Sequence, residues 1–158
     1  MSQKFEFEEG KKFEDVRLTY RTLLKANSVD KIAECFYGYR VGREGSTVTN
    51  ASMRTLQDGA EVLAKNISDI EADPTLSKDL TRKLTNNFAC NYFALLISST
   101  KLPSEQSGAF AKTFEQYLWV TKYGNYLSHK LIRCTISLFG VRTAQKILGL
   151  RRVLKHGK

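Results

Sequence analysis

The last quarter of this sequence lacks acidic side chains: no Asp or Glu occurs between residues 116 and 158. The same stretch carries nine Lys and Arg side chains, whereas residues 1–115 hold 16 basic and 16 acidic ones. The whole net charge of +9 on this 158-residue chain therefore belongs to its C-terminal segment. A segment of one sign suits an anionic surface, either phospholipid or nucleic acid.

Long apolar runs and export signals are also missing. No run approaches the roughly 18 apolar residues that a membrane span needs, and residues 2–6 have no apolar stretch of the kind found in signal peptides. A cytoplasmic location is the default expectation. Hydrophobic content of 42% and charged content of 26% are near globular averages, so we expect one domain with a modest core.

Cysteine and histidine are scarce and scattered. Cys35, Cys90 and Cys134 form no CxxC pair, and no His lies at zinc-site spacing from them. We expect three reduced, buried thiols. His129 and His156 have no partner at catalytic or metal-site spacing, so the sequence predicts no metal site and no triad in this chain.

Proline is rare as well, and after residue 50 apolar residues recur at helical spacing. Breaks at Asp73-Pro74, Pro103-Ser104, Gly124-Asn125 and Phe139-Gly140 separate the predicted helices. Pro74 fits the first turn of the second one. Three stripes carry most of the pattern: Met53, Leu56, Ala60, Leu63, Ile67 and Ile70; then Leu80, Leu84, Phe88, Tyr92 and Leu96; then Leu127, Leu131, Cys134 and Leu138.

The first 50 residues are of a different kind. Phe5 to Glu8 alternates like a short strand, and a short helix follows, with Asp15 as its expected N-cap. Residues 30–41 alternate apolar and polar side chains and predict a second strand. The sequence therefore predicts a mainly α, bundle-like protein with a small β element near its N-terminus.

Two short segments in this part carry candidate chemistry. Glu14 and Asp15 form an acidic pair at a loop-to-helix junction, where a carboxylate can act as a general base; equally, they can serve only as helix-start residues. Residues 40–46 read RVGREGS, and the Arg40 and Arg43 guanidinium groups with nearby glycines suit a diphosphate. An exposed turn is the alternative reading of that loop.

Together, EGKKFED at residues 9–15 and YGYRVGREGS at residues 37–46 resemble the second half of the catalytic domain of family-two, GT-A type glycosyltransferases of the bacterial surface-polysaccharide kind. The resemblance implies that Asp15 is the catalytic base with Glu14 beside it. It also implies that Arg40, Arg43 and Ser46 lie near the donor diphosphate. Residues 1–50 would be the C-terminal portion of the catalytic domain and residues 51–158 a helical extension with a basic tail.

The family's nucleotide-binding half and its metal-binding Asp-x-Asp are not in this sequence. Asp69 to Asp73 holds acidic residues, but a helix end before a proline is better read as solvated surface. The resemblance therefore predicts a C-terminal fragment that is inactive alone and prone to self-associate. It holds no cofactor itself, and Mg²⁺ or Mn²⁺ is expected in the complete enzyme. That enzyme would transfer a sugar from a nucleotide-sugar donor, with inversion, to a lipid-linked or saccharide acceptor.

The basic tail has readings of its own. Leucines and cations alternate in residues 126–158, which is typical of a helix lying in an anionic membrane interface, here the inner face of the plasma membrane. Alternatively, the apolar residues complete the helical core and the cations are simply solvated. A basic helical module that binds nucleic acid or a partner protein is the other function class. Nucleic acid is the less favoured ligand.

Overall fold

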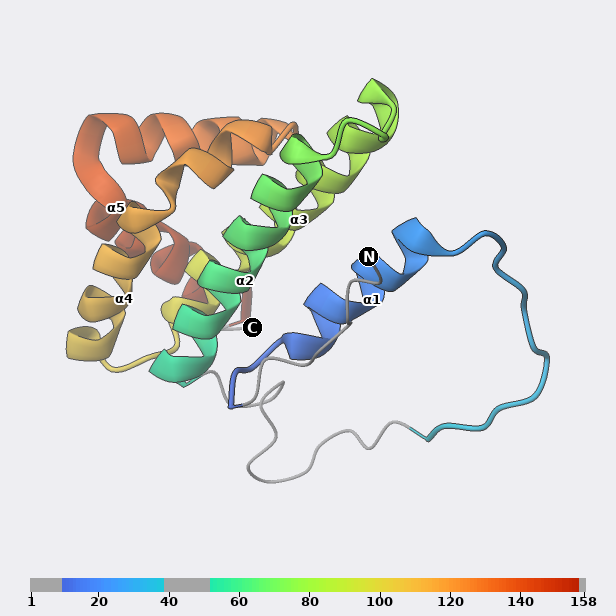
Figure 1. Ribbon diagram of the computed structural model, residues 1–158. Coiled ribbons are helices and arrows are strands. Elements are labelled where there is room, and N and C mark those ends of the chain that lie inside the picture. Colours follow the sequence, from blue (N-terminus) through green and yellow to red (C-terminus); the bar gives the residue numbers. More distant parts are fainter. Residues whose placement is uncertain (1–9, 39–51, 157–158) are drawn as a thin grey trace.

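The computed structural model describes residues 10–38 and 52–156, and every regular element in these ranges is a helix (Figure 1). This confirms the mainly helical fold. In order, the elements are α1 (Glu14–Lys25), α2 (Met53–Ala72), α3 (Lys78–Ser99), α4 (Ser104–Gln116), the 3-10 helix η1 (Leu118–Tyr123) and α5 (Leu127–His156).

The breaks in the sequence set the boundaries of α2 and α3. The Ser52 hydroxyl accepts a hydrogen bond from the Thr55 amide at 3.1 Å and so caps the start of α2. Ser77 caps α3 in the same way. α3 begins only at Lys78, so Pro74 lies in the preceding turn and not in the first helical turn, as the sequence had suggested.

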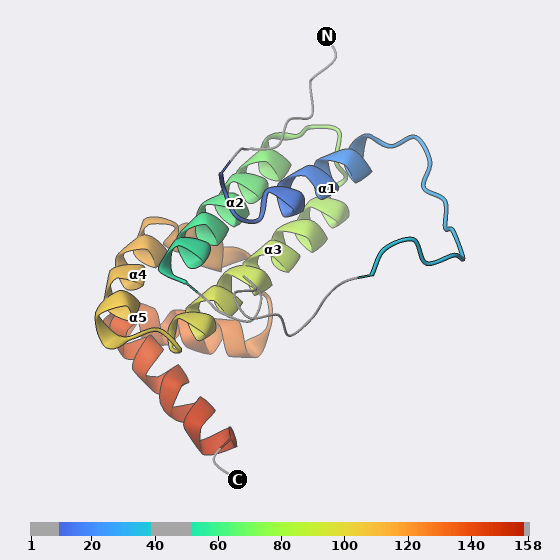
Figure 2. The same ribbon diagram turned by 90° about the horizontal axis from the view of Figure 1, so that it is seen from below.

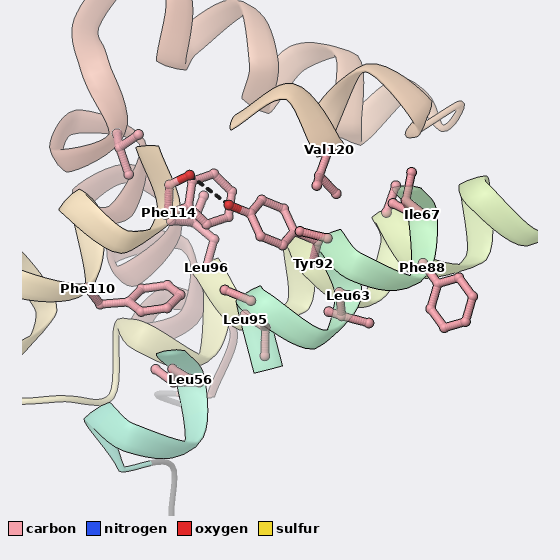
Figure 3. Close-up of a cluster of buried hydrophobic side chains, with 14 of the residues drawn as sticks. Leu56, Leu63, Ile67, Phe88, Tyr92, Leu95, Leu96, Phe110, Phe114 and Val120 are labelled. Atoms are coloured by element: carbon pink, nitrogen blue, oxygen red, sulfur yellow. Dashed lines mark hydrogen bonds between the residues drawn. The ribbon is translucent and has the colours of Figure 1, made fainter. Parts of the chain in front are cut away.

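The core lies mainly between α2 and α3, with α4, η1 and part of α5 closing it (Figure 3). The two longest predicted stripes face it: five of the six α2 positions are buried, and on α3 the stripe is buried from Phe88 onward. Leu84 is half-buried, and Leu80, near the helix start, is exposed. Phe110 and Phe114 of α4 are fully buried beside them.

Tyr92 joins α3 to α4 at the centre of this core. Its ring stacks on the Phe114 ring with 4.3 Å between centroids. Its hydroxyl donates a 2.7 Å hydrogen bond to the Phe114 carbonyl oxygen, the dashed line in Figure 3. This bond lets a tyrosine be buried at low cost, because the polar tip keeps a partner. Burial raises the pKa of the Tyr92 phenol far above its ordinary value.

α1 is an outer helix with no fully buried residue, and it packs against α2 and α3 (Figure 1). The Tyr20 ring meets the Phe88 ring edge-on at 5.4 Å. Arg17 forms an ion pair with Asp69 at 3.0 Å, and the Tyr20 hydroxyl donates to the same carboxylate at 3.3 Å. Burial, and then the Asp69 charge, raise the pKa of Tyr20 to about 12.

Only part of the predicted β element falls among the described residues. Residues 26–38 form no helix or strand and run out from the helical body (Figure 1). Val29, Ile32, Phe36 and Tyr37 are all strongly exposed there, and the described residues contain no strand with which this segment could pair. The short strand expected near Phe5, and residues 39–41 of the longer one, lie outside the described residues.

α5 is two helices joined at Gly140, whose φ of 80° and ψ of 166° interrupt the helical backbone. Glycine alone adopts that conformation readily. The first half (residues 127–139) covers the core through Ile132 and Ile136, and the second half begins with Val141 and Ala144 buried. The last turns lead away from the bundle towards the C-terminus (Figure 2).

Candidate functional site

The predicted acidic pair occupies the first turn of α1. The helix begins at Glu14, so Asp15 is its second residue and not its N-cap; Phe13 holds the cap position, with a left-handed φ of 65°. Asp15 is exposed, and its carboxylate accepts a 2.9 Å hydrogen bond from the Val16 amide. Both carboxylates therefore lie at the positive end of the helix dipole.

Contacts from residues 10–13 fix this end of α1 against the first turns of α2. The Arg54 guanidinium donates to the Gly10 carbonyl oxygen at 2.7 Å, and the Lys12 amide donates to the Asp58 carboxylate at 3.1 Å. Lys11 forms an ion pair with Glu61. Hydrogen bonds from Lys11 and then Lys65 lower the pKa of the Glu61 carboxyl.

Phe13 explains how closely the two helices meet. A Cβ atom at Gly59 of α2 would lie 3.0 Å from the Phe13 ring, so glycine lets the ring pack here without displacement. Further along, Arg17 reaches Asn66 and Asp69. The two helices thus run side by side in the same direction (Figure 2), and α1 begins beside Asp58 and Gly59 in the second turn of α2.

The rest of the predicted site is not placed. Arg40, Arg43 and Ser46 lie outside the described residues. The described residues resume at Ser52, the cap of α2, and the residues just before Glu14 contact the first two turns of that helix at Arg54 and Asp58. The structure therefore holds the start of α1, with the acidic pair, against the first turns of α2.

The acidic residues from Asp69 to Asp73 have protein partners. Asp69 binds Arg17 and Tyr20. The Asp73 carboxylate accepts from the Thr75 hydroxyl at 2.6 Å and from its amide at 2.9 Å, and these bonds lower the Asp73 pKa. Within residues 10–38 and 52–156, no three His, Cys, Asp or Glu side chains are grouped as a metal site would require.

A second candidate surface lies on the first half of α5, on the side away from the core. Its leucines form a ridge, which we define as Leu127, Leu131, Cys134 and Leu138. Leu127 is 73% exposed, Leu131 61% and Leu138 68%. The helix predicted from this stripe exists, but the stripe does not complete the core; Leu148 of the second half is half-buried, while Ile147 and Leu150 are exposed too.

Grooves flank the ridge on both sides. One, of about 330 Å³, lies between the two halves of α5 and is mostly apolar, lined by Leu127, Leu131, Ile132, Ala144, Ile147 and Leu148 among others. The other, of about 670 Å³, lies towards η1 and includes Trp119, Lys130 and Arg133. We call them the apolar groove and the basic groove.

Two of the three thiols are not buried as expected. Cys134 is exposed on the ridge because α5 packs through its opposite face, and Cys35 is exposed in the segment that leaves the bundle. Cys90, on α3, is half-buried, and burial raises its thiol pKa. An apolar sequence neighbourhood therefore did not identify buried thiols.

His129 is a structural residue that sequence reasoning missed. Its ring stacks on Phe93 with 4.2 Å between centroids, directly over Gly124, where a Cβ atom would lie 2.6 Å from the Phe93 ring. The glycine before the helix was the available signal, because it marks a close approach. Desolvation lowers the pKa of His129.

Comparisons with protein-family models, with curated proteins and with solved structures give no match for this chain. The functional assignment therefore rests on residues and geometry. None of the helices in the described ranges combines the length and the apolar character needed to cross a membrane.

Proposed function

We propose that this chain is the C-terminal part of an inverting GT-A type glycosyltransferase, which transfers a sugar from a nucleotide-sugar donor to a lipid-linked or saccharide acceptor. One observation supports the proposal: hydrogen bonds at Gly10 and Lys12, just before the acidic pair Glu14 and Asp15, hold this end of α1 against the first two turns of α2, the helix that follows the basic loop in the sequence.

Chain connectivity limits how far the loop's last predicted contact can be from this end. Ser46 and Ser52 are six positions apart in the sequence, and a chain of that length spans at most about 22 Å. The start of α1 lies beside the second turn of α2 here. Helix N-termini favour anions, so a diphosphate placed near Ser52, where α2 begins, gains from the dipole of α2 as well as from Arg40 and Arg43.

In this proposal Asp15 takes the proton of the acceptor hydroxyl while that oxygen attacks the anomeric carbon of the donor sugar. The bond from the anomeric carbon to the diphosphate breaks, and the nucleoside diphosphate leaves with the bonding electrons. Its exposed position leaves the Asp15 carboxylate open to an acceptor. A divalent metal ion bound by the nucleotide-binding half would neutralise charge on the leaving diphosphate.

The test supplies the chain with a nucleotide-binding half, encoded beside it in the genome or taken from a GT-A enzyme, and measures sugar transfer. Asp15→Asn should lower transfer by about 10²–10⁴-fold, because an amide cannot accept the proton, while donor binding changes little. The substitution only removes one charge from the first turn of α1, which costs about 0.3–1 kcal/mol, so the fold should survive.

Asp30→Asn is the matched control. Asp30 is also exposed, and its carboxylate accepts a 2.8 Å hydrogen bond from the next amide, just as Asp15 does. Transfer should be unchanged in this variant. Wild-type transfer by Asp15→Asn would reduce Asp15 to a helix-start residue, and no transfer with any nucleotide-binding half would count against the whole proposal.

A basic helical binding module is the second candidate, favoured by the exposed ridge of α5 and its grooves. The two candidates are compatible, because the ridge and the acidic pair are on different helices.

A further inference from the structure

The first half of α5 is apolar on two opposite faces. One face packs on the core through His129, Ile132 and Ile136. The other is the ridge, whose members follow one another at spacings of four, three and four residues and so line up along one side. A helix on the surface of a globular protein needs only one apolar face. A second apolar face that is exposed along four residues, as the ridge is, marks a docking surface.

The bend at Gly140 enlarges this surface. It sets the second half of α5 at an angle to the first, and the apolar groove lies between them. Ile147 and Leu150 are 52% and 64% exposed and extend the apolar surface beyond the groove. The ridge with its groove offers both a convex and a concave apolar contact.

The charged side chains of α5 itself are all basic. Residues 116–158 contain no acidic side chain, and Lys130, Arg142 and Lys146 are exposed on α5. Arg133 is partly engaged, because its guanidinium donates to the Lys122 carbonyl oxygen at 3.3 Å. An anionic partner therefore meets cations beside the ridge and no repelling carboxylate from the same segment.

Trp119 lines the basic groove, and its ring meets the Tyr123 ring edge-on at 6.3 Å. Trp119 is 39% exposed, and the Lys122 ammonium lies 4.6 Å from the Tyr123 ring centroid. Trp and Tyr next to Lys are the residue types found at the level of lipid headgroups, where an apolar ring has a polar edge.

We infer that α5 docks on an anionic lipid bilayer, with the ridge in the acyl boundary, an acyl chain of a bilayer lipid in the apolar groove, and the cations among the headgroups. Protein interfaces are poor in Lys at their centres, and nucleic-acid surfaces bind cations and stacking rings but not a row of exposed leucines. The lipid surface matches both the leucines and the lysines. This inference stands apart from the glycosyltransferase proposal.

The experiment measures flotation of the full chain with vesicles of phosphatidylcholine alone or with 30% phosphatidylglycerol, in 0.1 M and 1 M NaCl and a reductant that keeps Cys134 reduced. We expect binding to anionic vesicles, weakened but not abolished by salt, because salt screens charges but leaves apolar insertion intact. Trp119 is the sole tryptophan, so its emission should shift to the blue on binding and be quenched by lipids brominated on the acyl chain.

Two double variants, each with a control, separate the contribution of apolar insertion from that of charge attraction. Leu131→Ser with Leu138→Ser should lower binding at least tenfold at both salt concentrations. Its control, Leu23→Ser with Ile97→Ser, removes exposed apolar residues from α1 and α3 and should bind like wild type.

Lys130→Glu with Lys146→Glu should lower binding at least tenfold in 0.1 M salt and much less in 1 M salt. Lys31→Glu with Lys112→Glu makes the same change in net charge on exposed residues outside α5 and should have a far smaller effect. Circular dichroism and thermal unfolding confirm that each variant is folded.

Truncation after Leu150 removes four cations but keeps Val141 and Ala144, which belong to the core, and it should lower binding to anionic vesicles in 0.1 M salt. Equal binding to neutral and anionic vesicles, or no binding to either, would overturn the inference. So would salt-sensitive binding to DNA without lipid binding, or reversible dimerisation that depends on the ridge in a chain that ignores vesicles.

Discussion

α2 and the first half of α5 carry similar rows of apolar residues, yet the rows lie in opposite environments. Ala60 and Ile67 of α2 are fully buried, while Leu127 and Leu131 of α5 are mostly exposed. The row on α2 finds its partners in α3 and α4. The row on α5 finds none among the described residues that would bury it. Leucines at helical spacing thus indicate a partner, which can lie outside the domain.

The orientation of α5 is set by other contacts than its leucines. His129 stacks on Phe93, Arg133 donates to carbonyl oxygens of η1, and Ile136 enters the core. These residues are spaced four and three apart and define one face. Because the ridge lies opposite, the face that carries His129, Arg133 and Ile136 holds the helix in place and leaves the leucines available for binding.

The largest expected effect tests this contrast directly. Leu96→Ala, at a fully buried position of α3, should lower the free energy of unfolding by about 2–5 kcal/mol, because it removes buried apolar contacts and leaves a cavity. Leu131→Ala on the ridge should change it by less than about 0.5 kcal/mol. Urea denaturation measures both. Comparable losses would mean that the ridge is buried in solution, for example between two copies.

The sequence predicted the helices well because their breaks are chemically explicit. Asp73-Pro74, Gly124-Asn125 and Gly140 each end a helix where expected. The stripes on α2 and α3 also identify the core, because both helices are central and lie among several neighbours. The spacing of the apolar residues alone identifies the buried face when a helix has only one apolar face.

The sequence could not predict which face of α5 packs, because both faces are apolar and the deciding contacts are long-range. The Phe93–His129 stack joins residues 36 positions apart. Asp15 as N-cap failed for a local reason: Phe13 adopts the left-handed conformation, which is uncommon for a residue with a side chain, and starts the helix early. The hydrogen bond from Arg54 to the Gly10 carbonyl oxygen, which ties the residues before α1 to the first turn of α2, has no signal in the sequence.

An intermediate effect is expected at the bend that separates the two halves of α5. Gly140→Ala should lower the free energy of unfolding by about 1–3 kcal/mol, because a side chain is strained at φ 80° and ψ 166° even though nothing lies within 4 Å of the new Cβ atom. Thermal or urea unfolding measures the loss.

Gly149→Ala is the matched control for the bend. It lies in the second half of α5 without a positive φ, and its Cβ atom would make an ordinary 3.6 Å contact with Thr100. The free energy of unfolding should rise by up to about 1 kcal/mol in this variant, since Ala favours a helix more than Gly does. Equal effects of the two substitutions would show that Gly140 is not held in its strained conformation.

The smallest expected effect concerns pH and the inner face of α5. Desolvation lowers the pKa of His129 below its ordinary value of 6.5, so the unfolded chain takes up this proton before the folded one does. Stability from His129 is therefore complete above about pH 6.5 and declines as the pH falls from there towards the lower folded-state pKa.

Asp79 and Glu61, whose pKa values are lowered from below 5, titrate outside this window. His129→Phe keeps a ring on Phe93 but cannot bind the proton, so the free energy of unfolding measured between pH 7 and 5 should decline less steeply than in the wild type. The same slope in the two proteins would place the His129 ring in water and remove it from the contacts that orient the helix.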